Sequence, residues 1–422
     1  MSTLCADSVH NPTQTRRRFL RLAGAAAVCA LAGPRVLATP SATEELPPFA
    51  DKTRLLTLFL CGDVMTGRGI DQILPHPGDP RLYEPYIRDA RDYVRLAERR
   101  NGPVKRPVAF DYPWGDALAE LQRVVPDARI INLETAITVS DRYRPKGINY
   151  RMNPANIGCL TAAGVDCCVL ANNHVLDWDV AGLQETLATL DGAGIRRAGA
   201  GRHLEEGMAP AVIPVPGKGR VLVFACGLES SGIGRRWAAD TRQPGVQLLP
   251  DLSMASVDTL AEQVQRFKGA GDIAVVSIHW GGNWDYRIPR QQRDFARALI
   301  DTAGVDVIHG HSSHHVKGIE VYNERPILYG CGDLLSDYEG ISGHEEFRGE
   351  LGLMYFLSLA PATGRLQRFE MTPTRLQRLR INRASREEAQ WLAGVLNREG
   401  RPLGSRAVLG EDSRLTLQWD TA

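Results

Sequence analysis

Six apolar runs of strand length alternate with amphipathic segments along the middle of this chain, and this pattern most constrains how it can fold. The runs cover residues 55–61, 129–133, 167–171, 221–226, 273–279 and 305–309. Most of them are apolar without interruption, which is typical of strands covered on both faces. Amphipathic segments at 180–193, 256–268 and 289–303 lie between the later runs. Strands that alternate with helices indicate an α/β sheet.

The pattern changes from residue 318 onward, where IEVY, ILYG and LGLMYFLSLA are separated by short turns. Such closely spaced runs predict antiparallel strands, so we expect a mixed sheet. Residues 75–116 predict an insertion with a helical middle between the first two strands. We expect one main domain over residues 55–360, preceded by a leader at 39–54 and followed by an appendage at 361–422 packed on that domain.

The first 38 residues have the organisation of an export signal. The pair Arg16-Arg17 followed by Phe19-Leu20 resembles the twin-arginine motif of bacterial export. An apolar stretch of about a dozen residues follows, shorter than the roughly 20 that span a bilayer, and a small-residue cleavage site ends at Ala38. We therefore expect a periplasmic protein that starts near Thr39, has no membrane span after cleavage and has the twin-arginine export machinery as a partner.

The charge balance argues against a nucleic-acid-binding protein. The chain has 50 Lys and Arg against 49 Asp and Glu, so no net positive field attracts a polyanionic nucleic acid. Eight cysteines in 422 residues are too few for a disulfide scaffold. Six of them lie beyond the export signal, mostly beside apolar runs and without CxxC spacing. This placement favours small buried side chains over a disulfide or a metal thiolate.

Residues able to bind a metal ion follow five of the apolar runs. They are Asp63, Glu134, Asn172-Asn173-His174, His279 and His309-x-His311. Because strand ends in α/β sheets converge on one crevice, these side chains can meet in space. A single histidine in such a position is more often structural, but the repetition favours a metal site. Carboxylate, amide and imidazole donors without thiolates suit one or two divalent ions such as Mn, Fe or Zn.

Five segments resemble the capsule-synthesis protein CapA family, which is named for poly-γ-glutamate capsule production and has a calcineurin-like metallophosphoesterase fold. They occur in the family order and are GDVMTGRGID (62–71), NLETAIT (132–138), NNHVLDWDVAGLQETLATLDGAGI (172–195), HWGGNWDY (279–286) and GHSSHHVKGIEVYNERPILYGCGDLLSDY (310–338). The resemblance implies an α/β fold, specifically a metallophosphoesterase-like four-layer α/β/β/α sandwich with mixed sheets, over roughly residues 55–360.

The resemblance also implies roles for individual residues. The metal ligands would be Asp63, Glu134, Asn173, His279, His311 and His314. His174 would be the catalytic acid that donates a proton to a leaving group. Asp177 would orient the His174 ring, and a helix N-cap is the alternative for it. Arg68 would bind an anionic substrate group, and an ordinary ion pair is the alternative.

Two positions depart from the family pattern. Asp63-Val-Met65 stands where metallophosphoesterases usually have Asp-x-His, and GHSSH stands where the family commonly has GHHPH. These two differences could remove one metal ligand. A site that binds a single ion is therefore an alternative to a two-ion site. His309 and His315 are the residues that could compensate.

Two functions fit these observations. The first is a metal-dependent, phosphoesterase-like hydrolase that uses metal-activated water on a phosphoester or another bond in an anionic cell-envelope polymer, within capsule or poly-γ-glutamate biosynthesis. The second is a non-catalytic, metal-binding accessory protein for polymer assembly or export. Retention of Asn173, His174 and His279 favours hydrolysis, whereas Met65 weakens it. A solute-binding protein would have two similar lobes and no need of ligand residues after five strands.

Overall fold

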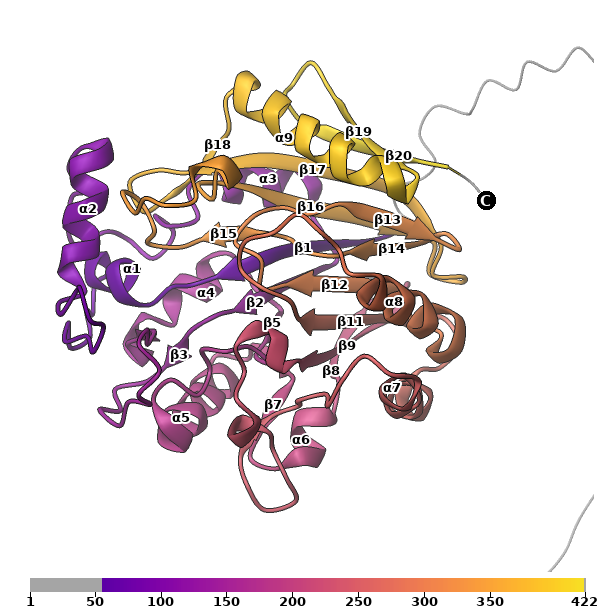
Figure 1. Ribbon diagram of the computed structural model, residues 1–422, viewed down its shortest axis with the longest axis horizontal. Helices are drawn as coiled ribbons and strands as arrows, with labels where there is room; N and C mark the ends of the chain where they lie inside the picture. Colours follow the sequence, from indigo (N-terminus) through magenta and orange to yellow (C-terminus); the bar gives the residue numbers. More distant parts are fainter. Residues whose placement is uncertain (1–54, 421–422) are drawn as a thin grey trace, which may run out of the picture. The chain divides into compact units, whose positions relative to one another are not determined.

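Two stacked β-sheets organise the part of the chain that the structure, a computed structural model, describes, which is residues 55–420 (Figure 1). The larger sheet has ten strands in the order β19-β20-β17-β16-β1-β2-β5-β6, with β15 also paired to β1 and β18 to β17. The smaller sheet has six strands in the order β13-β14-β12-β11-β9-β8. The expected export signal and leader lie outside the described residues.

The larger sheet is built from strands at both ends of the described chain. Its members are β1 (Leu56–Val64), β2 (Ala128–Leu133), β5 (Cys167–Val169), β6 (Arg196–Ala198), β15 (Asp333–Leu335), β16 (Leu351–Leu359), β17 (Leu366–Leu376), β18 (Ile381–Arg383), β19 (Ser405–Leu409) and β20 (Leu415–Trp419). Strands β1, β2, β5 and β6 are parallel to one another, whereas β1 pairs with β16, and β16 with β17, in antiparallel fashion. The expected mixed sheet is confirmed.

The smaller sheet comes from the middle of the chain. Its members are β8 (Ala211–Val215), β9 (Gly219–Gly227), β11 (Ile273–His279), β12 (Val307–His311), β13 (Ile319–Tyr322) and β14 (Arg325–Leu328). Strands β9, β11, β12 and β14 are parallel, and β8 and β13 are antiparallel edge strands. Two short pairs, β3 (Ala136–Ile137) with β4 (Arg151–Met152) and β7 (Ala200–Gly201) with β10 (Gly245–Val246), lie outside both sheets.

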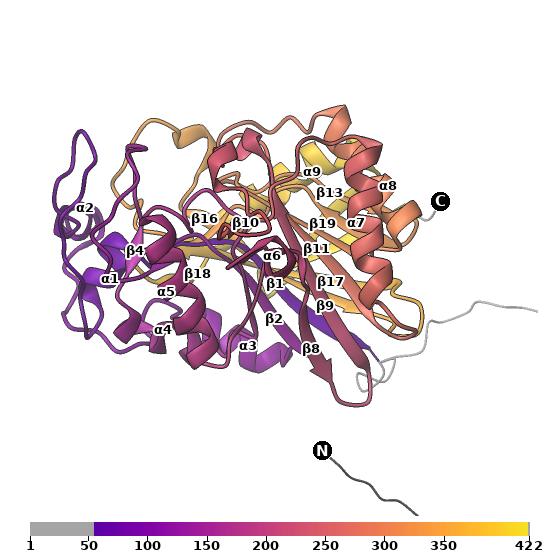
Figure 2. The same ribbon diagram turned by 90° about the horizontal axis from the view of Figure 1, so that it is seen from below.

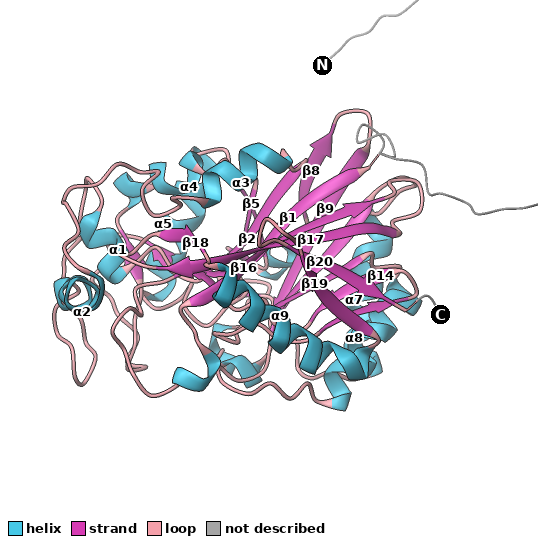
Figure 3. Ribbon diagram, turned by 90° about the horizontal axis from the view of Figure 1, so that it is seen from above, coloured by secondary structure: helices cyan, strands magenta, loops and turns pink. Residues whose placement is uncertain are grey.

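Helices surround the two sheets (Figure 3). They are α1 (Arg68–Ile73), α2 (Arg91–Asn101), α3 (Ala117–Val124), α4 (Gly158–Ala162), α5 (Asp179–Gly192), α6 (Leu204–Met208), α7 (Met254–Phe267), α8 (Arg290–Ala303) and α9 (Arg386–Gly400). Helices α1 and α2 lie together at one end (Figure 1), and α7 and α8 contact each other and lie over the smaller sheet (Figure 2). Helix α9 contacts β17 and β19 of the larger one. The α/β/β/α arrangement expected from the family resemblance is thus the one observed.

Successive side chains along β9 and β11 point to opposite faces, and both faces are buried. This explains why the two strands are unbroken apolar runs in the sequence. Val223 and Val275 belong to the core that the two sheets share, whereas their neighbours Phe224 and Val276 belong to the core under α7 and α8. All four side chains are fully buried. Since both faces of these strands are covered, neither face has a place for polar residues.

Strands β1 and β12 extend further than the apolar runs predict. Strand β1 was expected to end at residue 61 but continues to Val64, because it gains the short parallel strand β15 as a neighbour. Strand β12 likewise runs to His311 rather than residue 309. Asp63 and His311 therefore lie inside strands and not in the loops that follow them, which fixes their backbone by sheet hydrogen bonds.

Three further expectations can be compared with the described residues. Helix α2 is the helical middle of the insertion at 75–116. The six cysteines of residues 55–420 are free and buried, as their apolar surroundings predict. No helix in that part of the chain is both long enough and apolar enough to cross a membrane.

Buried ion pairs tie the C-terminal strands to the rest of the molecule. Glu120 on α3 is 4% exposed and pairs with Arg123, Arg383 and Arg414 at 2.8 to 2.9 Å. These contacts hold the pKa of Glu120 near 2, since hydrogen bonds and charge from the arginines outweigh the opposing effect of burial. Helix α9 begins at a capping box in which Ser385 and Glu388 bond to each other's backbone N–H.

Candidate metal centre

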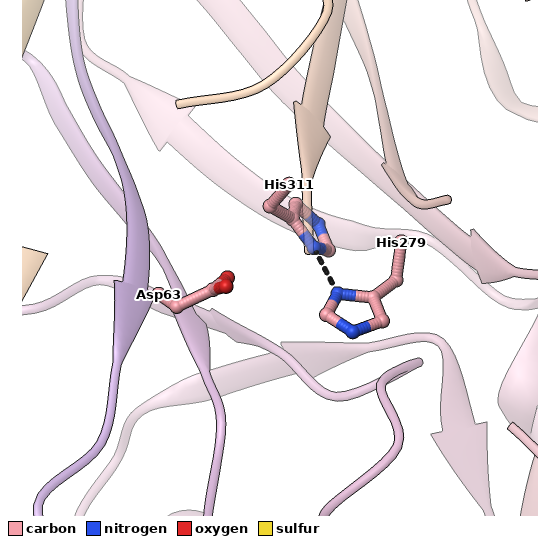
Figure 4. Close-up of side chains that lie close together, drawn as sticks. All are labelled: Asp63, His279 and His311. Atoms are coloured by element: carbon pink, nitrogen blue, oxygen red, sulfur yellow. Dashed lines mark hydrogen bonds between the residues drawn. The ribbon is translucent and has the colours of Figure 1, made fainter. Parts of the chain in front are cut away.

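Two groups of potential metal ligands meet where β1, β2, β11 and β12 end, and they share one carboxylate. Asp63, His279 and His311 each offer a ligand atom, and these atoms lie within 4.8 Å of one another (Figure 4). The second group consists of Asp63, Glu134, His314 and Asp333, whose ligand atoms also lie within 4.8 Å of one another. Because Asp63 belongs to both groups, the arrangement could hold one ion or two neighbouring ions bridged by its carboxylate.

Strand register brings the carboxylates together. Asp63 of β1 is the Cα partner of Asn132 on β2 and of Asp333 on β15. The Asn132 side-chain amide donates a hydrogen bond of 2.7 Å to Asp63 Oδ1. The other oxygen, Oδ2, is thereby left to face the centre.

Two glycines allow this close approach. A Cβ atom on Gly62 would lie 1.6 Å from the carbonyl oxygen of Gly332, so no other residue fits there without a backbone shift. Gly332 itself has φ of +74°, a conformation that favours glycine. The carbonyl of Gly332 accepts a hydrogen bond of 2.9 Å from the backbone N–H of Asp63. The turn before β15 is consequently held directly against the ligand-bearing end of β1.

The carboxylate oxygens of this centre fit a cation. Asp63 Oδ2 and Asp333 Oδ2 are buried and have no hydrogen-bond partner, a costly state for a charged group that is not paired. Burial, with the nearby Asp333 charge, raises the pKa of Asp63 to about 7. Burial and the charges of Asp63 and Asp333 likewise raise the pKa of Glu134. A divalent ion would supply the missing partner for these oxygens.

The histidines of the first group are neutral, and each could bind a metal ion through one ring nitrogen. His279 Nδ1 lies 2.7 Å from His311 Nδ1, and His279 Nε2 lies 3.1 Å from Asn173 Oδ1. Both rings are fully buried, and burial lowers the pKa of each far below its ordinary value. A neutral imidazole keeps one bare nitrogen, which is the atom that binds transition metals.

His314 belongs to the second group and has a charged partner. Its Nδ1 lies 2.9 Å from Asp333 Oδ1. Burial lowers the pKa of His314, but the carboxylates of Asp333 and Asp63 outweigh burial, so the pKa is raised overall. The His314 ring is therefore held beside the carboxylates of Asp333 and Asp63.

His174 lies at the rim of the centre with its orientation fixed by Asp177. His174 Nδ1 donates to Asp177 Oδ2 at 2.7 Å, and its Nε2 lies 4.0 Å from Glu134 Oε1. Asp177 also accepts a 2.7 Å bond from the Tyr150 backbone N–H and pairs with Lys146 at 2.8 Å. Burial, reinforced by Lys146 and opposed by Asp177, lowers the pKa of His174 to about 4. Asp177 makes the contacts of an orienting residue and does not cap α5, whose N-cap, Trp178, has no side-chain cap bond.

Arg68 makes the contacts of a buried ion pair. Its guanidinium is bonded to Glu84 at 2.8 Å and to Asp337 at 3.1 Å, and it lies over the ring of Tyr93. The residue is 3% exposed. These partners match the ion-pair alternative, although the residue also lines the cleft described below.

The two spare histidines do not belong to either ligand group. His309 Nε2 is bonded to the Cys61 carbonyl at 2.7 Å. His315 Nε2 accepts from the backbone N–H of Asp285 at 3.2 Å. Each ring therefore has a structural partner, and Met65, where an Asp-x-His motif would have its histidine, is a buried apolar side chain.

A cleft of about 930 Å³ opens above the centre. Asn173, His174 and His314 form part of its lining, and Lys146 and Trp284 form another part. The cleft thus gives a ligand access to the proposed acid and to the edge of the metal centre, with a lysine beside both.

Comparisons with known proteins agree with this architecture. A family profile described as "Bacterial capsule synthesis protein PGA_cap" matches residues 57–338. The chain belongs to this family. Among similar proteins, a probable polyglutamine synthesis accessory protein of Mycobacterium tuberculosis is 48% identical over 365 residues, covering 86% of this chain and 96% of that protein. The PGA biosynthesis protein CapA of Bacillus subtilis is 28% identical over 321 residues, covering 76% and 71%.

One solved structure is distantly similar. It is GAP50, the anchor in the inner membrane complex of Plasmodium, with a TM-score of 0.32 and 9% identity over 81% of this chain and 95% of that one. This likeness is too weak to support an argument about the fold or the function.

Two residues of the centre in this PGA_cap-family chain were missed by sequence reasoning. Asp333 lies in GCGDLLSDY, which was part of the family resemblance but received no role; its position after two glycines was the available signal. Lys146 lies in a loop that no pattern marks, and only the fold brings its ammonium group to Asp177.

Proposed function

We propose that this chain acts in capsule or poly-glutamate synthesis as a metal-dependent hydrolase of the phosphoesterase type. The observation that carries the proposal is the pair of ligand groups sharing Asp63, with two buried carboxylate oxygens that lack partners. Membership in the PGA_cap family and the names of the relatives from Mycobacterium tuberculosis and Bacillus subtilis support the polymer context. The substrate class we propose is a phosphoester or another hydrolysable bond of an anionic polymer.

The protein's own residues would supply ligands and a proton. Asp63, Glu134, Asn173, His279, His311 and His314, together with Asp333, would hold one or two divalent ions such as Mn, Fe or Zn. Such an ion supplies Lewis acidity and lowers the pKa of a water molecule beside the substrate.

His174 would act as the general acid that donates a proton to the leaving group. Since its Nδ1–H donates to Asp177, its Nε2 is the nitrogen turned toward Glu134 and the centre. A proton taken up at Nε2 would be stabilised by the Asp177 carboxylate and could then pass to a departing oxygen. Lys146 and the Tyr150 backbone hold Asp177 in place, so the ring keeps one orientation.

A second candidate function is a metal-binding accessory protein without turnover. It is favoured by the buried Met65, which stands in place of a histidine ligand, and by the word "accessory" in the name of the Mycobacterium tuberculosis relative. In this case the same residues would bind an ion, and the cleft would hold polymer.

For the first 38 residues we propose a cleaved twin-arginine signal, which would deliver the protein to the periplasm through that export machinery. The twin-arginine pattern at Arg16-Arg17 supports this. Expression in a bacterium with and without the machinery, followed by N-terminal sequencing, tests it. A protein that reaches the periplasm in both strains, or keeps residues 1–38 there, would contradict the proposal.

The experiment that tests the function is metal content per chain, measured by plasma mass spectrometry on untagged protein purified without chelators. We expect one or two equivalents of Mn, Fe or Zn, and less than about a tenth of that after Asp63→Ala or His279→Ala. The matched control is His76→Ala, which removes an exposed histidine outside both ligand groups. Unchanged metal in both ligand variants would overturn the site assignment.

Turnover separates the two candidate functions. Metal-loaded protein is assayed on chromogenic phosphoesters and on γ-glutamyl polymer, with His174→Gln as the variant. Hydrolysis by the wild type that falls about 100-fold in His174→Gln, at unchanged metal content, supports the hydrolase. Polymer binding without turnover in the wild type supports the accessory protein instead.

A further inference from the structure

A chain of hydrogen bonds runs from the larger sheet, through the smaller sheet, to the metal centre. It starts at the backbone carbonyl of Cys61 on β1, which lies 2.7 Å from His309 Nε2. His309 Nδ1 lies 3.1 Å from Ser277 Oγ, and the same oxygen lies 2.8 Å from His311 Nε2. We refer to Cys61, His309, Ser277 and His311 as the histidine wire. The wire ends at His311, whose Nδ1 lies 2.7 Å from His279 Nδ1.

Strand register aligns the side chains of the wire. Ser277 on β11 is the Cα partner of His309 on β12, and His279 is the partner of His311. Residues two apart on a strand point to the same face, so Ser277, His279, His309 and His311 all project from one face of the smaller sheet. The bond from His309 to the Cys61 carbonyl identifies this as the face turned toward β1.

The histidines of the wire must be neutral. His309 and Ser277 are fully buried and His311 is 1% exposed. His309 lies at hydrogen-bond distance from a carbonyl and a hydroxyl, and His311 lies at that distance from a hydroxyl and another imidazole. A buried imidazolium with no carboxylate partner is strongly disfavoured. Each ring therefore has one N–H and one bare nitrogen.

The Cys61 carbonyl then dictates the order of donors along the wire. A carbonyl oxygen can only accept, so His309 Nε2 carries the proton and His309 Nδ1 is bare. The Ser277 hydroxyl must donate its single proton to that bare nitrogen. Its oxygen is left to accept, which requires the proton of His311 to be on Nε2.

We propose that Ser277 and His309 are positioning residues that lock His311 in the Nε2–H tautomer, so that Nδ1 is the atom that binds the ion. This inference deepens the proposed function and rests on it for the role of the ion, whereas the tautomer itself follows from the protein alone. Ser277 and His309 touch neither the cleft nor a carboxylate of the centre, and they act on the ion only through His311.

The wire also explains how the facing Nδ1 atoms of His311 and His279 can act together. His311 presents a bare Nδ1, and Asn173 Oδ1 lies 3.1 Å from His279 Nε2, so it accepts a hydrogen bond from the Nε2–H of that ring. With His279 protonated on Nε2, its Nδ1 is bare as well. Two lone pairs at 2.7 Å repel each other unless a cation lies beside both. The Nδ1 atoms of His311 and His279 are thus both free to bind one ion next to Asp63.

The tautomers can be measured directly by NMR on metal-free protein. In protein with 15N-labelled histidine, protonated and bare ring nitrogens resonate at well-separated shifts. We expect His309 and His311 both to show a protonated Nε2 and a bare Nδ1 at neutral pH, with signals assigned by single variants. A proton on Nδ1 of either ring would overturn the inference, whatever the metal content of the protein.

Two variants of His309 separate an orienting role from mere packing. In His309→Leu, Ser277 loses its acceptor and is free to donate to His311 Nε2, so we expect His311 to change to the Nδ1–H tautomer. In His309→Gln, a side-chain amide can donate to the Cys61 carbonyl and accept from Ser277, so the tautomer should be kept. The inference fails if His311 has the same tautomer in both variants.

Metal affinity gives a second readout, by titration of Mn²⁺ or Zn²⁺ into metal-free protein. Loss of an outer partner of a ligating histidine typically weakens binding about 10- to 100-fold. We expect such a loss for Ser277→Ala and His309→Leu, and a change below about threefold for His309→Gln. The control is Ser405→Ala, which removes another buried hydroxyl that donates to a carbonyl, in β19 and outside both ligand groups.

The outcomes distinguish this inference from the proposed function. If the tautomers are as stated but no metal binds to wild-type protein, the proposed metal centre is wrong and the inference about the wire is kept. If wild-type protein binds metal and Ser277→Ala binds it equally well, with unfolding unchanged, the wire fails and the centre stands.

Discussion

Replacing Asp63 with asparagine should stabilise the metal-free protein while abolishing metal binding. Asp63 Oδ2 is buried without a partner, and Asp333 places further negative charge beside it. An asparagine keeps the acceptor for Asn132 at Oδ1 and puts a donor where Oδ2 was, next to the Asp333 carboxylate. The substitution therefore removes a repulsive charge and places an N–H within 4.8 Å of the carboxylates of the second ligand group.

The size of the effect depends on pH. Burial raises the pKa of Asp63 from 3.8 to about 7 in the folded protein. Folding therefore takes up a proton, so the stability that this group contributes is complete below its unfolded pKa and is lost as pH rises toward about 7. At about 1.4 kcal/mol for each unit, the full loss is about 4 kcal/mol. We expect Asp63→Asn to exceed the wild type by about 2–4 kcal/mol near pH 8, and by less near pH 5.

The assay is urea unfolding of both proteins in the presence of a chelator, at about pH 5 and about pH 8. The control is Asp258→Asn, an exposed position on α7, which should change the free energy of unfolding by less than about 0.5 kcal/mol. If Asp63→Asn is less stable than the wild type at both pH values, or the difference is independent of pH, the reasoning about this carboxylate is wrong. Added Mn²⁺ should reverse the order, since only the wild type binds it.

Three further predictions test other parts of the structure. Arg68→Met leaves Glu84 and Asp337 buried without their cation and should lower the free energy of unfolding by about 3–5 kcal/mol in urea, whereas a substrate-binding arginine would leave stability nearly unchanged. Ser385→Ala removes the capping box of α9 and should cost about 1 kcal/mol, measured in the same way. Saturating Zn²⁺ or Mn²⁺, at about 100 times its Kd, should stabilise wild-type protein by about 2.7 kcal/mol, seen as a rise in Tm; no rise would count against the metal centre.

The central strands, and several of the side chains that meet at the candidate centre, could be predicted from the sequence because they leave a strong local signal. Strands β9 and β11 are covered by a sheet on one face and helices on the other, so their residues must be apolar throughout. A polar residue at the end of such a run then stands out, as His279 does at the end of β11.

The rest of the centre could not be predicted, because its signals are not local. Strand β15 has three residues and no apolar run, so apart from the glycines before it the sequence does not mark Asp333 as a neighbour of Asp63. The same holds for Lys146, which comes from a loop. His309 was recognised as a histidine near the site, but only the distances to Ser277 and the Cys61 carbonyl show that it serves another ligand.

The contact between Gly62 and the Gly332 carbonyl makes the candidate centre sensitive to a position that supplies no ligand. Any side chain at position 62 would push β15 away from β1 and separate Asp63 from Asp333, because the Cβ would lie 1.6 Å from that oxygen. A single nucleotide change in the Gly62 codon is enough, and it alters no ligand. A comparison of the candidate ligand residues alone would not detect such a change.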